Sequence, residues 1–404
     1  MSQLNYSPDS KYLGRYADIL INFALNQGAG LKPSEVVLIK VPDVAKPLAW
    51  HLQKKVLESG GHPILRLIPT GGFDRAFFEQ ANSNQLNFFP KKYLKAEADL
   101  INHQISIIAD VDPYELQSVE PQKIMQRSQT VKPYRDWLTK KELQKKFSWT
   151  IALWGTPAKA NIVGLSLPNY WQQIIQACWL DNDEPVIKWQ EIKNQQKALK
   201  KCLNDLEIEN IHLESDDADL KIKIGANRQW LGGDGNNIPS FEVFTSPDWR
   251  FTSGWIKFNQ PLYRQGNVVK NIALTFKKGR VVKFSATKGK QFLEQMLQVP
   301  NGDKLGEFSL TDARMSRITH TMAEILYDEN ISNNTHVALG TAFKECYRGD
   351  KTKLTNQDWK KLGFNDSAVH TDLISTANRK VTATLTNGQE KVIYENGRFT
   401  IWNP

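Results

Sequence analysis

The sequence is poor in cysteine and lacks any long apolar run. Three cysteines occur in 404 residues, and no two of them form a C-x-x-C pair. An odd number of cysteines without such a pair argues against a disulfide framework and against a thiolate zinc site. It suits a protein of the reducing cytoplasm. No stretch approaches the roughly 18 apolar residues of a membrane span, so we expect no membrane partner.

Several common motifs are also missing. The N-terminal residues 1–6 lack a basic start followed by an apolar run, so we expect no signal peptide and a cytoplasmic protein. Neither an H-E-x-x-H helix nor a G-x-S-x-G elbow occurs, and the glycines at 232–235 fit no phosphate-binding fingerprint. The standard zinc-protease helix, serine-hydrolase elbow and nucleotide-binding loop are therefore excluded.

Acidic residues are outnumbered, with 43 Asp and Glu against 52 Lys and Arg, for a formal charge of +9. Such a surplus suits either a nucleic-acid partner or a solvated basic surface. The basic residues are dispersed, and Glu142 and Leu143 interrupt their densest stretch, residues 139–146. No zinc-finger spacing or aromatic RNA-binding strand occurs. We favour the solvated surface and expect no nucleic-acid partner.

The periodicity of apolar residues predicts two regions. Helical spacing at 13–24 and 48–57 alternates with short apolar runs at 36–39, 63–68 and 105–109, an order typical of a parallel sheet. From about residue 208 short strands follow one another, and two Asn-Gly turns indicate hairpins. We predict an α/β N-terminal domain with a mainly parallel sheet, residues 1–130. An α+β metal-binding catalytic domain rich in antiparallel strands follows, residues 131–404.

Carboxylates and histidines recur in the second region. Glu242 lies in an alternating segment and shares a face with Phe244, although a solvated edge-strand glutamate is an alternative. His370 and Asp372, at i and i+2 of a strand, would point to one face. His336 heads an apolar segment, where a core histidine is the plainer interpretation. Carboxylate oxygens and imidazole nitrogens are divalent-metal ligands, so convergence of these segments would indicate a metal-dependent hydrolase.

Two further glutamates are less informative by themselves. Glu307 follows Gly306, which permits a sharp turn or a close backbone approach. Glu329 and Asp328 follow an amphipathic run, residues 318–327, that we expect to be helical. An acidic pair at a helix end is unfavourable unless a cation, a metal or a lysine, compensates it.

Taken together, the order and spacing of these segments resemble the thermophilic-aminopeptidase family of metallopeptidases, the group of aminopeptidase T, aminopeptidase S and PepS. The blocks that carry the resemblance are Asn-Ile-Pro-Ser-Phe-Glu-Val-Phe-Thr at 237–245, Gly-Glu at 306–307, Asp-Glu-Asn at 328–330, His-Val-Ala-Leu-Gly at 336–340 and His-Thr-Asp at 370–372. The motifs in these blocks are specific as a set. In the N-terminal third the chain matches the family mainly in its general sequence pattern.

The resemblance implies a ligand set and a reaction. The ligands of two divalent metals, zinc, cobalt or manganese, would be Glu242, Glu307, His336, His370 and Asp372, with Glu329 as a sixth. Glu307 or Glu329 would act as general base in releasing N-terminal residues from short peptides. A homodimer is also implied.

The sequence departs from the family pattern at three places. Phe343 stands where the family has a tyrosine, and Tyr347 would replace that hydroxyl if the segment is helical, because it lies one turn further along. Ser240-Phe241 replaces Asp-Gly, and two extra residues precede His336. Two alternatives therefore stay open: a catalytically weak relative that keeps its metal, and a metal-dependent amidase with a different substrate.

Overall fold

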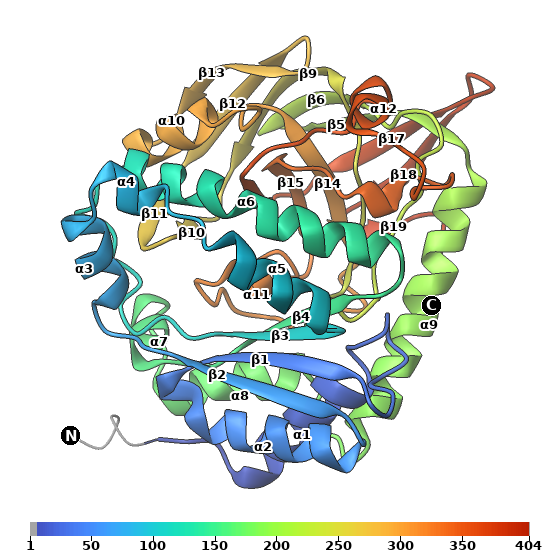
Figure 1. Cartoon of the computed structure of the whole chain (residues 1–404). Helices are drawn as coiled ribbons and strands as arrows, with labels where there is room; N and C mark the ends of the chain where they lie inside the picture. Colours follow the sequence, from blue (N-terminus) through green and yellow to red (C-terminus); the bar gives the residue numbers. More distant parts are fainter. Residues whose placement is uncertain (1–5, 404) are drawn as a thin grey trace.

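The N-terminal region forms a parallel five-stranded sheet (Figure 1). The computed structural model describes residues 6–403, so most of the segment considered for a signal peptide lies outside the described part. The strand order is β2 (His62–Ile68), β1 (Val36–Pro42), β3 (His103–Ile108), β4 (Ser148–Leu153) and β7 (Asn237–Ile238), with every neighbouring pair parallel. The apolar run predicted as a strand at 36–39 lies in β1, and its residues 37–39 are fully buried because helices cover both faces.

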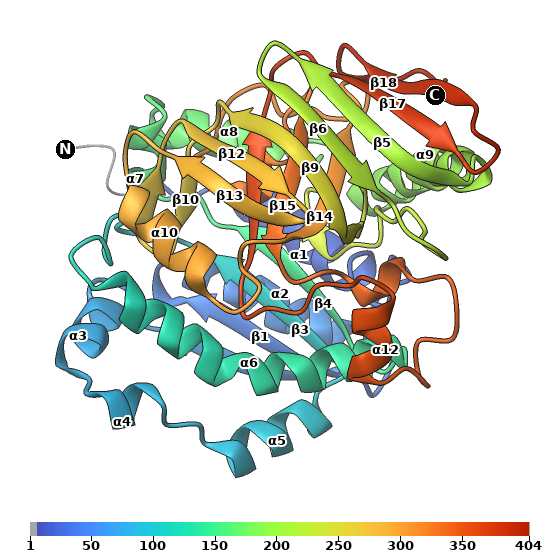
Figure 2. The ribbon, with the colours of Figure 1, turned by 90° about the horizontal axis from the view of Figure 1, so that it is seen from above.

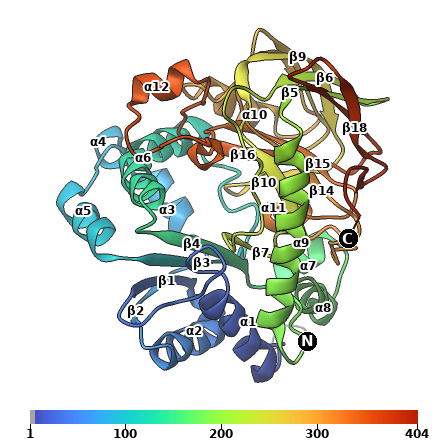
Figure 3. The ribbon, with the colours of Figure 1, turned by 90° about the vertical axis from the view of Figure 1, so that its right-hand side faces the viewer.

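Helices lie on both faces of this sheet. α1 (Ser10–Asn22) and α2 (Lys46–Glu58) cover one face, and α6 (Pro121–Leu143) lies on the other. The predicted helical spacing holds in α1, where Leu13, Tyr16, Ala17 and Leu20 are buried. The remaining helices of this half are α3 (Phe73–Gln80), α4 (Ser83–Leu86), α5 (Lys91–Leu100), α7 (Pro157–Ile162), α8 (Leu167–Ala177) and α9 (Pro185–Asp205), with a 3-10 turn, η1 (Asp43–Ala45). α9, the long helix among them, runs along one side of the molecule (Figure 3).

The expected boundary at residue 130 does not coincide with the end of the parallel sheet. That residue lies inside α6, and β4 and β7 both come from later in the chain. β7 is only two residues long and directly precedes the Glu242 segment. The sheet of the first region and the candidate ligands of the second are thereby connected by a few residues.

The second region contains an antiparallel sheet of eight strands (Figure 2). Its order is β13 (Arg280–Ser285), β12 (Ile272–Lys277), β9 (Asp248–Phe258), β6 (Ala218–Lys223), β5 (Ile208–Ser215), β17 (Lys380–Leu385), β18 (Glu390–Glu395) and β19 (Arg398–Phe399). Asn387-Gly388 joins β17 to β18 and Asn396-Gly397 joins β18 to β19, as the turn signals predicted. A separate hairpin pairs β10 (Leu262–Arg264) with β11 (Asn267–Val269).

A smaller antiparallel sheet lies in the interior. Its strands are β16 (His370–Ser375), β15 (Thr335–Gly340), β14 (Leu305–Thr311) and β8 (Glu242–Thr245), in that order. Every residue of β14 and β15 is buried, and both β14 and β16 contact β9 of the larger sheet. The parallel N-terminal sheet and these antiparallel sheets confirm the predicted fold class.

The remaining elements are short. They are α10 (Lys290–Gln298), α11 (Ile325–Asp328), α12 (Asn356–Lys361) and a 3-10 turn, η2 (Lys344–Cys346). The helix expected over residues 318–327 is therefore wrong, because only its last residues are helical. The Asp328 carboxylate instead accepts hydrogen bonds from the backbone N–H groups of Met322 and Glu324 and stabilises an irregular segment. Within residues 6–403, no helix combines the length and hydropathy needed to cross a bilayer.

Candidate metal centre

The register of the small sheet places the candidate ligands on one face. Across β14, β15 and β16, Glu307 pairs with Ala338, which pairs with Asp372. One step along the same face, Ser309 pairs with His336. Paired residues of an antiparallel sheet point to the same side, and so do residues two apart on one strand. The alternation seen in the sequence thus becomes a single face carrying carboxylates and imidazoles.

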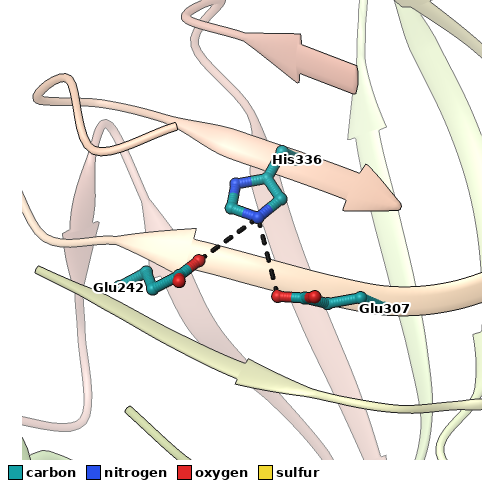
Figure 4. A group of neighbouring side chains, drawn as sticks. All are labelled: Glu242, Glu307 and His336. Carbon is teal, nitrogen blue, oxygen red and sulfur yellow. Dashed lines mark ion pairs between the residues drawn. The ribbon is translucent and has the colours of Figure 1, made fainter. Parts of the chain in front are cut away.

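Glu242, Glu307 and His336 form the first group (Figure 4). Nε2 of His336 lies 3.2 Å from a carboxylate oxygen of Glu242 and 3.6 Å from one of Glu307. All three side chains are nearly inaccessible, at 6%, 3% and 1% relative exposure. Glu242 lies on the edge strand β8, but its burial shows that it is not the solvated glutamate considered as an alternative.

Two further groups share members with the first. Glu307, His370 and Asp372 form one, with His370 Nε2 3.3 Å from Glu307 and 3.4 Å from Asp372. Glu329, His336 and Asp372 form the other, with ligand atoms within 4.8 Å of one another. Glu307 directs its two oxygens to different histidines. All six predicted metal residues therefore lie in one connected cluster.

The spacing of the ligand atoms suits a divalent ion. Ligands about 2.1 Å from a tetrahedrally coordinated zinc ion are about 3.4 Å from each other. The His–carboxylate separations of 3.2, 3.3, 3.4 and 3.6 Å bracket that value. Cys346, the nearby thiol, is no part of these groups, and burial followed by the charge of Glu307 raises its pKa to about 12.

Neighbouring polar groups orient the ligands. Nδ1 of His370 lies 2.8 Å from the carbonyl oxygen of Thr341, which can only accept, so Nδ1 carries the proton and Nε2 presents its lone pair to the cluster. Ser309 donates to Glu242 at 2.8 Å. Asn237 of β7 donates to Glu329 at 3.0 Å, which attaches this ligand to the parallel sheet. These contacts support a preformed ligand set.

The electrostatics of the cluster call for cations. Burial raises the pKa of Glu329 well above its ordinary value, and the carboxylates of Glu242 and Asp372 raise it further. Burial alone lowers the pKa of His336, but hydrogen bonds and charges from Glu242 and Glu307 outweigh it and hold that pKa well above the usual value. Three buried carboxylates and the partly buried Asp372 face two imidazoles, so a positive charge placed among them would be strongly stabilised.

Gly306 is required by the backbone next to Glu307. A Cβ atom at this position would lie 2.2 Å from the carbonyl oxygen of Thr341 and 2.7 Å from that of Gly340. β14 also shifts its register at this point, between Leu305 and Glu307. The close approach suggested by the Gly-Glu dipeptide is therefore present, and it sets the position of the Glu307 side chain.

The aromatic positions around the cluster differ from expectation. Phe343 lines the cavity and stacks edge-on against the His370 ring at 4.8 Å between centroids. The segment after it is a short 3-10 turn, and Tyr347 has extended backbone angles, so the helical relation between the two residues is wrong. Tyr347 packs against Trp359 and Phe364 and is not among the residues that line the cavity.

The cluster opens into a cavity of about 650 Å³ between the two regions of the fold. Sequence reasoning missed several charged residues here. Lys159 of α7 is 1% exposed and lies behind the lining, where it pairs with two lining carboxylates, Asp110 at 2.9 Å and Glu324 at 3.1 Å. Arg264 of β10 lines the same cavity. Lys159 and Arg264 lie outside the sequence blocks that resemble the family, and no pattern of residue spacing points to them. Ser309 could have been predicted, because it lies two residues after Glu307 on the same strand and therefore on the same face.

A largely buried set of oxygen and nitrogen ligands that opens into a cavity is the arrangement of a metal-dependent hydrolase. The sequence pattern of the family described as Thermophilic metalloprotease (M29) matches residues 9–399. That range covers nearly all of the chain and every candidate ligand, and the chain belongs to this family.

Curated relatives and a solved structure agree with this assignment. The chain is 26% identical to Aminopeptidase PepS of Streptococcus thermophilus, over 96% of this chain and 98% of the relative. It is 24% identical to Aminopeptidase T of Thermus aquaticus, over 95% and 98%. The structure of wild-type AmpT from Thermus thermophilus superposes with a TM-score of 0.80 at 23% identity, over 96% of this chain and 99% of that one. At this identity the superposition supports the fold.

Proposed function

We propose that this protein is an aminopeptidase that uses two divalent metal ions to remove N-terminal residues from short peptides. The observation that carries the proposal is the sharing of Glu307, His336 and Asp372 among three ligand groups. Shared ligands are what a pair of neighbouring ions requires. Two divalent ions would also balance the four carboxylates Glu242, Glu307, Glu329 and Asp372.

Each residue of the cluster has a task in this proposal. Glu242, Glu307, His336, His370 and Asp372 would hold the two ions, and Glu307 and Asp372 belong to groups that contain different histidines. The chemistry such ions supply is polarisation of the scissile carbonyl and a lowered pKa of water, together with a place for the free α-amino group. Glu307, whose oxygens face both histidines, accepts the proton of the attacking water as general base, with Glu329 as the alternative base.

The cavity supports small substrates. A volume of about 650 Å³ falls in the ordinary range of small-molecule sites, about 300–1,000 Å³. Folded proteins would not enter it, whereas peptides of a few residues would. The set of oxygen and nitrogen ligands suits zinc, cobalt or manganese alike.

Metal content and substrate range test the proposal together. Purified protein loaded with Zn²⁺, Co²⁺ or Mn²⁺ is assayed with alanyl-p-nitroanilide, alanyl dipeptides and their N-acetylated counterparts, with and without chelator. We expect two ions per chain and chelator-sensitive turnover of substrates with a free amino group only. Two bound ions without turnover would favour the weak relative, for which Phe343 is the motivation. Cleavage of the N-acetylated substrates would favour the amidase.

The role of Tyr347 stays a prediction that a single variant tests. Tyr347→Phe removes the hydroxyl and keeps the ring contacts with Trp359 and Phe364. A fall in kcat of more than about tenfold would support a donor role. An unchanged kcat removes Tyr347 from the mechanism.

A homodimer is also proposed. Figure 2 shows α3, α4 and α5 along one side of the molecule. The segment from α3 to α5 and the edge strand β2 expose large apolar side chains: Leu65, Leu67, Phe73, Phe77, Phe88, Tyr93 and Leu100. Exposed apolar surface of this kind commonly marks an interface. Phe88→Glu should shift the mass measured by light scattering from dimer to monomer, and a monomeric wild type would refute the proposal.

A further inference from the structure

The cavity that contains the metal centre is strongly acidic. Nine carboxylates line it, against the cations Lys145, Arg264 and Lys351. Lys351 lies near Glu345, a residue outside the metal cluster: burial raises the pKa of that carboxyl, and the charge of Lys351 opposes the rise. Arg264 belongs instead to the metal-centre side of the cavity. An anionic part of a substrate would be repelled by most of this lining and attracted at few points.

Arg264 is held beside a metal ligand by the strand arrangement. It is the last residue of β10, and β10 contacts β16, the strand that carries His370 and Asp372. Burial lowers the pKa of Arg264, while the carboxylates of Asp372 and Glu324 oppose that shift, which places both near the guanidinium. Arg264 therefore lines the same cavity as the candidate ligands His370 and Asp372.

Within the described part of the chain the guanidinium has no partner. Among residues 6–403 it makes no hydrogen bond within 3.5 Å and no ion pair within 4.0 Å, whereas the buried Arg379 bonds to Asp217, Thr335 and Lys257. Its side chain is only partly exposed and lines the cavity. Partial burial of a charged group without a partner is costly, so the five N–H donors of Arg264 are placed where a ligand can accept from them.

The chemistry of that ligand follows from the shape of the donor. A guanidinium is planar and binds a carboxylate through two parallel hydrogen bonds, more strongly than it binds a neutral carbonyl. Consecutive Cα atoms are about 3.8 Å apart, so the C-terminal carboxylate of a dipeptide lies one residue beyond the scissile bond. The side-chain carboxylate of an acidic N-terminal residue is comparably close.

We propose that Arg264 binds a carboxylate of the substrate and so directs the enzyme to short peptides with a carboxylate close to the scissile bond. The inference rests on the proposed aminopeptidase function and specifies its substrate class. Arg264 is a specificity-determining residue here, because it recognises the substrate through a group that does not react.

Matched pairs of substrates test this role and distinguish the two sources of the carboxylate. Ala-Ala is compared with Ala-Ala-amide, and Glu-Ala-amide with Gln-Ala-amide, in the wild type, Arg264→Met and Arg264→Lys. In the wild type we expect kcat/KM to favour the charged member of at least one pair by about 10- to 100-fold. Arg264→Met should reduce this preference to about one, mainly through KM, and Arg264→Lys should keep part of it. The substrate pair whose preference is lost in Arg264→Met shows whether Arg264 binds the C-terminal carboxylate or the side-chain carboxylate of the N-terminal residue.

The matched control is Lys351→Met, which removes another cation of the same cavity and should leave both ratios unchanged. Because each ratio is measured within one variant, a general loss of activity or of folded protein cancels. Equal ratios in the wild type and Arg264→Met, or an equal loss on all four substrates through kcat, would overturn the assignment. No turnover of any substrate by the wild type would instead refute the aminopeptidase proposal.

Discussion

Phe343→Tyr is the substitution that most directly probes why this chain departs from its family. Phe343 lines the cavity and packs between Phe244, at 5.3 Å between ring centroids, and His370, at 4.8 Å. Its backbone N–H donates to Ser246 at 2.8 Å, an interaction that the substitution leaves in place. The change therefore adds one hydroxyl group beside a candidate metal ligand and alters little else.

The expected size of the effect follows from what such a hydroxyl does. One donor aimed at a developing oxyanion typically contributes about 10²–10³ in rate. We expect Phe343→Tyr to raise kcat by about 10- to 10³-fold with little change in KM. A hydroxyl that points into the cavity has little effect on stability, whereas one buried without a partner costs about 1–3 kcal/mol.

The assay is steady-state hydrolysis of alanyl-p-nitroanilide by metal-loaded protein, with thermal unfolding measured in parallel. Phe244→Tyr is the matched control, since it adds the same group to a neighbouring ring of the cavity and should change kcat by less than about threefold. An unchanged kcat in Phe343→Tyr, with the midpoint of unfolding also unchanged, would show that the missing hydroxyl does not limit the rate. That result would refute the reasoning about this position.

Three further predictions concern the metals and the buried charges. His336→Ala removes a ligand shared by two groups, so metal analysis should find at least one ion fewer per chain; full occupancy would contradict the site. Lys159→Met leaves the carboxylates of Asp110 and Glu324 unpaired and should lower the free energy of unfolding in denaturant by about 3–5 kcal/mol, against almost no change for the exposed Lys201→Met. Burial and then the charge of Glu345 raise the pKa of Glu142 from 4.5 to about 8, so the folded protein binds more protons than the unfolded chain between these values. Stability should therefore fall as pH rises from about 4.5 to 8, by up to about 1.4 kcal/mol per pH unit, and Glu142→Gln should lack this part of the slope. Identical slopes in chelator-treated wild type and variant would contradict the shift.

The local periodicity of apolar residues was sufficient to predict much of the fold. Alternating helix and strand patterns before residue 110 predicted the parallel sheet, and the Asn-Gly turns predicted the last two hairpins. The helix expected at 318–327 failed because Asp328 accepts hydrogen bonds from the backbone N–H groups of Met322 and Glu324 and holds them out of a helix. Two strands of the parallel sheet, β4 and β7, come from beyond the expected boundary at residue 130, and β7, with two residues, is too short to show a period.

By itself, the sequence determined which side chains share a face. A strand repeats every two residues, so His370 and Asp372 point together in any fold that makes the segment a strand. The tertiary structure alone decided which faces meet. Arg264 lies near Asp372, and Lys159 pairs with Glu324, only because segments more than a hundred residues apart in the chain pack side by side. No local pattern encodes such pairings, since they depend on the packing of whole sheets rather than on the neighbours of each residue along the chain.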